Sequence, residues 1–266
     1  MHYLSLYLEF IKINLYSMIQ YRVAYITSML AQALDYGVSF ILIWVMIYRF
    51  GTLNGWLPYE VMFLYALSLC SYAIAGFFLH ITMSNLSSMI LNGEFDEVLT
   101  KPMNPLLYLA SRNFSPGYVS HIALSVAIMA VSFVNLGIKL TPYKIIFLCI
   151  CILGAALIQG AAFLFTSVPS FWITQNRLKQ ILFHQLRTFI DYPISLYNQF
   201  VQIILTLIIP YAFINFYPAQ YFLGKQDFLM FNQSFQYLTP LIGLVLFILA
   251  YKFWNYGLRH YKSTGT

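Results

Sequence analysis

The stretch IIFLCICILGAALIQGAAFLFTSV, residues 145–168, decides the fold because it is long, apolar and free of charged residues. As a helix it would extend about 36 Å, which is enough to cross a hydrocarbon core of roughly 30 Å. Similar stretches occupy residues 25–48, 61–80, 119–136, 196–216 and 238–254. The sequence therefore predicts an all-α membrane protein, with six transmembrane helices in a single domain over residues 1–266.

The composition of the whole chain agrees with this prediction. Hydrophobic residues make up 61% of the chain and charged residues 8%, and the mean hydropathy is +0.73, whereas soluble domains carry about 25% charged residues. The net charge of +6 is read as an excess of basic residues that faces anionic lipid headgroups. It does not indicate a nucleic-acid partner.

Lysine and arginine are concentrated in alternate connections between the apolar stretches. Of the 14 such residues, 10 lie in the set of connections that contains both ends of the chain, and 4 lie in the other set. Because positive residues mark the cytoplasmic side, both termini are predicted to be cytoplasmic. The long basic connection at 170–192 is assigned to the same side.

Two segments outside the spans are predicted to lie along or inside the membrane. Residues 1–22 have apolar side chains on one helical face, which favours an amphipathic helix in the headgroup plane; the alternative is an extension of the first span. Residues 217–237 contain Pro218 and Gly224 and are rich in aromatic residues. They are predicted to form an external re-entrant segment between spans five and six.

The inside connection at residues 83–117 contains the stretch GEFDEVLTKPMNP, residues 93–105. It holds three of the eight acidic residues of the chain, and two prolines end the helical turn that Gly93 starts. A short amphipathic helix held between two spans suits a docking site for a cytoplasmic partner. An ordinary solvated loop is the alternative.

A few polar residues lie inside or at the start of predicted spans. Asp35 would lie near the middle of the bilayer, where a charged carboxylate costs about 3 kcal/mol or more, so it should face protein or a wet cavity. Asn198, Gln199 and Gln202 begin the fifth span with a polar stripe. These four residues are candidates for a translocation path or a seam between subunits; the alternative for each is a structural hydrogen bond.

The stretch at 93–105 resembles a motif of type 2 ABC export permeases, G-x-x-D-x-x-L-x-[KR]-P-x-N, in the six-span branch that works with a second related permease. The matching residues are Gly93, Asp96, Leu99, Lys101, Pro102 and Asn104. Residues 192–197 and 209–219 are similar to span-five signatures of that branch. With the six spans, the N-terminal interfacial helix and the re-entrant segment before the last span, the resemblance covers essentially the whole chain.

This resemblance implies that the segment is a coupling helix, which seats in a groove of a separate ABC ATPase subunit. The implied coupling residues are Gly93, Glu94, Phe95, Asp96, Glu97, Leu99, Lys101 and Pro102. Two ATPase chains, with ATP and Mg²⁺ bound to them, would join this permease and a second permease, identical or homologous, among membrane lipids. The expected activity is export of an amphipathic or lipid-like molecule, drug or peptide across a bacterial inner membrane.

Motifs for chemistry in the chain itself are absent from the sequence. There is no GxxxxGK[ST], GxSxG or HExxH, so we expect no enzymatic activity, no cofactor and no metal on this chain. Cys70, Cys149 and Cys151 lie within apolar spans and form no CxxC pair. The alternative function is a secondary transporter or channel subunit with Asp35 in the pathway; an intramembrane enzyme is a more distant possibility.

Overall fold

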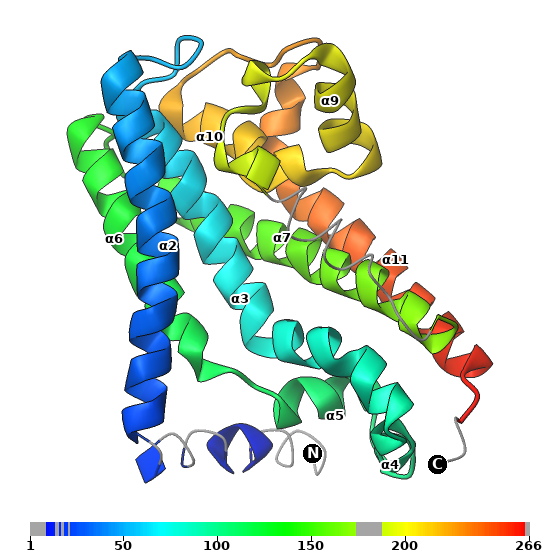
Figure 1. Cartoon of the computed structure of the whole chain (residues 1–266). Helices are drawn as coiled ribbons and strands as arrows, with labels where there is room; N and C mark the ends of the chain where they lie inside the picture. The colour runs from blue at the N-terminus through cyan, green and yellow to red at the C-terminus, as the bar shows by residue number, and fades with distance from the viewer. Residues whose placement is uncertain (1–8, 14–15, 17–18, 21, 174–187, 264–266) are drawn as a thin grey trace.

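A computed structural model of the chain describes residues 9–13, 16, 19–20, 22–173 and 188–263. The side-chain environment of some residues of the first long helix, Asp35 among them, is outside this description. In the described residues every regular secondary-structure element is a helix, as Figure 1 shows. The predicted all-α class is therefore confirmed.

Five helices are long. They are α2 (Arg22–Phe50), α3 (Pro58–Leu91), α6 (Val119–Asn135), α7 (Pro142–Ser167) and α11 (Thr239–His260). The shorter segments are α4 (Glu94–Leu99), α5 (Pro105–Arg112), η1 (Pro116–Tyr118), η2 (Val168–Phe171), η4 (Phe189–Asp191), η5 (Ile194–Leu196), α9 (Gln199–Ile203), the π-helical turn η6 (Ile204–Ile208), η7 (Tyr211–Phe213), α10 (Phe216–Leu223) and η8 (Gln233–Tyr237).

Four helices are long and apolar enough to cross a membrane, namely those at Pro58–Leu91, Pro116–Asn135, Pro142–Phe171 and Thr239–His260. They coincide with the second, third, fourth and sixth predicted spans. The first predicted span lies within α2, which is a continuous helix. The fifth has a different form in the structure, so the number of six spans stays a prediction.

The two ends of the helical bundle are distinct, and we name them after the elements found there. The α4 end holds α4, α5, the described residues 9–13 and the last turn of α11 (Figure 1). The α9 end holds α9, α10 and the loop between α2 and α3. Buried residues form one apolar cluster toward each end. The predicted interfacial helix at 1–22 is described at 9–13, 16 and 19–20, where it is helical, and at Arg22, where α2 begins, so this prediction stays open.

Helix α3 is the centre of the bundle, and α7 packs against it along a polar contact. In the most apolar window of α3, 83% of the residues are buried, against 22% in α11. Gln159 is the one amide side chain of the stretch 145–168, and its Nε2 donates to the carbonyl of Ser68 at 3.0 Å and to Ser71 Oγ at 2.7 Å. This buried amide therefore joins two helices, as buried amides do between membrane spans.

Helices α7 and α11 run in the same direction and cross at two glycines. A Cβ atom added to Gly243 would lie 2.2 Å from the carbonyl oxygen of Gly154, and one added to Gly154 would lie 2.6 Å from the Cα of Pro240. The two backbones are thus in direct contact, which only residues without a side chain permit.

The fifth predicted span, residues 196–216, is not a continuous helix. It forms α9 and η6, breaks at Ile209–Pro210, and continues as η7 and α10 at an angle of 77°. Pro210 lacks an amide hydrogen and cannot continue the helical hydrogen bonding, and the preceding π-helical turn ends with Ile209 N donating to Ile204 O at 2.8 Å. The prediction of one continuous span over these residues is wrong.

Both flanks of this bent pair (Gln199–Leu223) are fastened to the loop that joins α2 and α3. On one flank, Trp56 Nε1 donates to Ser195 Oγ at 3.1 Å. On the other, Lys225 Nζ donates to the carbonyl of Gly55 at 2.7 Å and forms an ion pair with Glu60. Both flanks therefore lie at the α9 end, so the bent pair begins and ends at the same end of the bundle.

The connection that precedes the bent pair also differs from the prediction. Phe171 lies at the α4 end, where its ring contacts Phe95, whereas the carbonyl of Ile190 accepts from Asn215 Nδ2 at 2.6 Å at the α9 end. The chain thus changes ends between Phe171 and Ile190. The assignment of 170–192 to a single inside loop is wrong at its C-terminal end; residues 174–187 of that loop lie outside the described residues.

Candidate functional site at the α4 end

Helix α4 forms where the sequence predicts a short amphipathic helix. Gly93 has φ +72°, a left-handed conformation that suits glycine, and it turns the chain from the end of α3 into α4. Residues 83–91 of the predicted inside connection belong to α3 instead, because this stretch contains no glycine or proline that would end the helix before Asn92 and Gly93. The remainder of the connection consists of α4, α5 and the turns that join them.

Phe95 and Val98 face the protein and are fully buried. The ring of Phe95 lies in an aromatic cluster, 5.3 Å from Phe171, 6.3 Å from Trp254 and 5.1 Å from Tyr261, with edge-to-face geometry in each pair. Edge-to-face pairs add about 0.5–1.5 kcal/mol each to the effect of burial. Phe95 therefore attaches α4 to η2, which continues α7, and to the C-terminal part of α11 and the residue after it.

Asp96 is engaged within the chain. Its carboxylate accepts one hydrogen bond from the hydroxyl of Tyr261, at 2.9 Å, and another from the hydroxyl of Ser263. Burial first, and then the hydrogen bond and charge of Asp96, raise the pKa of the Tyr261 phenol from 10.0 to about 12. The phenol thus stays a hydrogen-bond donor at neutral and moderately alkaline pH, and loses this role only as the pH rises through about 12.

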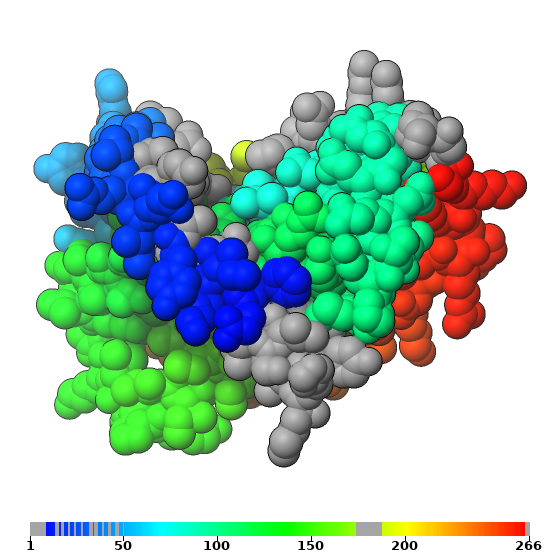
Figure 2. Space-filling view, turned by 90° about the horizontal axis from the view of Figure 1, so that it is seen from below, coloured from blue at the N-terminus to red at the C-terminus, as the bar shows by residue number. Residues whose placement is uncertain are grey.

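The opposite face of α4 is exposed at the α4 end of the molecule. Glu94, Glu97 and Leu99 are exposed, Leu99 to 42%, and Glu97 forms a surface ion pair with Lys101 at 3.1 Å. Pro102 is exposed as well. Figure 2 views this face, on which α4 and α5 lie between the α11 end and the N-terminal residues.

The turn after Pro102 is held by Asn104. Its Oδ1 accepts from the amides of Leu106 and Leu107, at 3.1 and 3.2 Å, and so caps α5. Its Nδ2 donates to the Tyr251 hydroxyl at 2.8 Å. Asn104 was part of the sequence motif, but Tyr251, Trp254 and Tyr261 were not predicted as site residues. The sequence shows them only as aromatic residues near the end of a span.

We predict that Tyr261→Phe loosens α4 without unfolding the protein. The change removes one hydrogen bond to a carboxylate and keeps the ring contact with Phe95, so the local cost should be about 1–2 kcal/mol. Hydrogen exchange of the α4 amides should rise by about five- to thirtyfold, as measured by mass spectrometry. Tyr256→Phe, which changes an exposed tyrosine of α11, is the control, and equal exchange in both variants would contradict the prediction.

The candidates for a translocation path or seam are not brought together with α4. Asn198 caps α9, its Oδ1 accepting from Val201 N at 3.0 Å, and Gln202 is buried and donates to the carbonyl of Tyr197 at 2.7 Å. Gln199 is exposed. The side chain of Asp35 lies outside the described residues, so its role stays a prediction, as does the alternative of a secondary transporter or channel.

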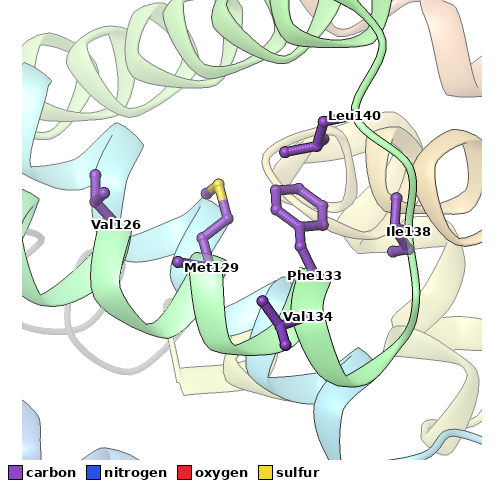
Figure 3. A pocket seen from close by; sticks show the side chains of 7 residues that line it. Val126, Met129, Phe133, Val134, Ile138 and Leu140 are labelled. Atoms are coloured by element: carbon purple, nitrogen blue, oxygen red, sulfur yellow. The ribbon is translucent and has the colours of Figure 1, made fainter.

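One surface cavity lies near the α9 end of α6 and has a volume of about 430 Å³. Figure 3 shows its lining, in which Phe133 and Met129 of α6 lie beside Ile138 and Leu140 of the following connection. All of its lining side chains are apolar. It offers contact to hydrocarbon and no group for chemistry.

Groups that could perform chemistry are sparse in the described part of the chain. It contains no cluster of three or more His, Cys, Asp or Glu residues that could hold a metal ion. Of the cysteines, Cys70 and Cys151 are buried and Cys149 is exposed. The features that stand out are therefore a helix with one anchored and one exposed face, together with membrane-spanning helices.

Comparison with known proteins identifies a family. The family model described as "ABC-2 family transporter protein" matches residues 33–265, which include the α4 segment and all the membrane-spanning candidates. No curated protein and no solved structure matches the chain. Members of this family are transmembrane components of ABC transporters and associate with an ATPase component. The chain thus belongs to the ABC-2 transporter family, as a multi-pass membrane permease.

Proposed function

We propose that this chain is the permease subunit of an ATP-driven ABC exporter and that α4 is its coupling helix. One observation carries the proposal: α4 presents Glu94, Glu97 and Leu99 outward while Phe95 locks it to α7 and α11. Such a helix can receive a movement from a partner on its exposed face and transmit it through its buried face.

The path of transmission is short. From Phe95, the contacts lead to Phe171 at the end of α7 and to Trp254 on α11. From Asp96, a hydrogen bond leads to the tail that follows α11. ATP binding by the partner would move α4 and, with it, the ends of two membrane helices. The binding energy of ATP would shift the permease between two states, with no chemistry in this chain.

The partners follow from this function. Two ATPase chains, which carry ATP and Mg²⁺, would bind two permeases, and the second permease would be identical or homologous to this one. The described residues nearest both termini lie at the α4 end (Figure 1), which supports cytoplasmic termini on the side of the ATPase. We propose a bacterial inner membrane as the location and an amphipathic or lipid-like molecule, drug or peptide as the substrate.

The test is co-purification of the tagged chain with an ATPase encoded nearby. In Glu94→Arg/Leu99→Ala, two exposed side chains change while the contacts of Phe95 and Asp96 stay. Recovery of the ATPase should fall by about tenfold, because removing a central contact of a docking surface costs more than about 1 kcal/mol where that contact is a hot spot.

The matched control is Lys139→Glu/Tyr143→Ala, which changes one charged and one exposed apolar residue at the α9 end. It should leave the ATPase recovery at the wild-type level. If the α4 double variant is folded and retains wild-type recovery, α4 is not the docking element. If no ATPase is recovered with any variant or the wild type, the exporter proposal itself is contradicted.

A further inference from the structure

A larger cavity lies on the side of the bundle between α3, α5, α7 and α11, with a volume of about 910 Å³. This volume lies in the range of sites that hold small molecules, about 300–1,000 Å³. Its walls include Ala75 and Leu79 of α3, Leu106 of α5, Ala156 of α7 and Phe247 of α11. Its lining extends from Leu106 of α5, at the α4 end, to Leu153 of α7 and Phe247 of α11, two helices that run side by side in Figure 1.

The cavity opens toward the surface of the bundle. Phe78, Leu107, Leu153 and Ile248 line it and are each at least 43% exposed. In a membrane-spanning protein such a rim of exposed apolar side chains faces hydrocarbon rather than water. A molecule that enters the cavity therefore comes from the bilayer.

The polar residues of the cavity lie together on α11 and can all donate hydrogen bonds. They are Tyr251, Lys252 and Asn255. No acidic residue lines the cavity in the described part of the chain, and Lys252 has no ion-pair partner there. The Tyr251 hydroxyl accepts from Asn104, which leaves its own hydrogen to donate. An apolar cavity with an ammonium group and further donors at one end complements an apolar chain with an anionic head.

We propose that this cavity binds an anionic phospholipid from the leaflet adjoining α4, with the headgroup on Lys252 and Asn255 and an acyl chain against Ala156 and Phe247. Between Phe247 and Asn255 the helix rises about 12 Å, so the head and the chain have separate places along α11. The site is distinct from the exposed face of α4, and its occupant is a resident lipid, whatever molecule is exported.

The bound lipid would also act on the coupling segment. A headgroup that accepts from Tyr251 lies one hydrogen bond away from Asn104, which caps α5 directly after α4. Binding would hold the Tyr251 ring in the position that Asn104 requires. The lipid would thus stabilise the α4–α5 connection through α11.

The first measurement is the lipid retained by the purified chain. The protein is placed in vesicles of equal amounts of phosphatidylglycerol and phosphatidylcholine, extracted in mild detergent, and examined by native mass spectrometry. The wild type should retain phosphatidylglycerol over phosphatidylcholine by about tenfold, the effect of one charge-assisted contact. Lys252→Gln should reduce this preference to near one, and Lys252→Arg should keep it.

Two further variants separate charge from cavity. Ala156→Leu partly fills the cavity and should reduce retention of both lipids, whereas Lys139→Gln removes a lysine at the α9 end and should change nothing. In phosphatidylglycerol vesicles, hydrogen exchange at 94–112 should be slower than in phosphatidylcholine for the wild type but not for Lys252→Gln.

The proposal is overturned if Lys252→Gln retains phosphatidylglycerol with the wild-type preference. It is equally overturned if the wild type retains both lipids alike, or if this face is covered by a second copy of the chain and carries no lipid.

Discussion

Replacing Phe95 by alanine is expected to abolish transport while the ATPase still binds. The fully buried ring holds α4 against Phe171, Trp254 and Tyr261, and removing a buried phenylalanine costs about 3–5 kcal/mol. The exposed residues of α4 are unchanged by the substitution. The partner would therefore bind a helix that no longer moves α7 and α11, and ATP hydrolysis would continue without export.

Three quantities test this expectation in the same reconstituted vesicles: the amount of ATPase recovered with the permease, the rate of ATP hydrolysis and the rate of substrate transport. Phe200→Ala removes a phenylalanine that is 71% exposed on α9 and should leave all three at the wild-type level. Normal transport by a folded Phe95→Ala variant would refute the transmission path. A Leu variant at the same position would keep much of the buried volume and should restore part of the transport.

Gly243→Ala is expected to prevent the normal packing of α7 and α11. The added Cβ would meet the carbonyl oxygen of Gly154 at 2.2 Å, and that atom belongs to the backbone, so no side-chain rotation can relieve the clash. The helices would have to separate, at a cost of about 3 kcal/mol, the upper end of the usual range for overpacking. Because the crossing also includes Pro240, the displacement would extend to the start of α11.

The measurement is the thermal midpoint and the monodisperse yield of the detergent-purified protein. Gly37→Ala is the matched control, since Gly37 is helical and a Cβ there would meet nothing within 4 Å. It should match or slightly exceed the wild type, because alanine favours a helix by up to about 1 kcal/mol over glycine. A Gly243→Ala protein as stable as Gly37→Ala would show that α7 and α11 do not cross this closely in the membrane.

The sequence was a good guide wherever a local signal decided the structure. The lengths of the apolar stretches predicted the helices α3, α6, α7 and α11. Gly93 and Pro102, which favour a helix start and a helix end, predicted the short helix α4 between those two residues. The partners of α4 could not be predicted, because Asp96 and Tyr261 are 165 positions apart and no local pattern pairs them. Asp96, one of the predicted coupling residues, accepts hydrogen bonds from Tyr261 and Ser263, and its role in coupling stays a prediction.

The fifth span shows where a hydropathy argument fails. Residues 196–216 are as apolar as a span because several of them, such as Phe213 and Phe216, are buried inside the protein. Burial in protein and burial in lipid select the same side chains, so composition cannot distinguish them. Pro210 was the available signal for a break, since proline interrupts helical hydrogen bonding.

The fastening of the bent pair at both flanks has a consequence for how the protein opens. Ser195 and Lys225 both contact the few residues around Trp56, so opening at one flank would also disturb the other. We therefore expect 199–223 to exchange its amides as a single cooperative unit. The largely buried pair of Lys225 and Glu60 adds to that barrier, since separating its charges would leave each one partly desolvated.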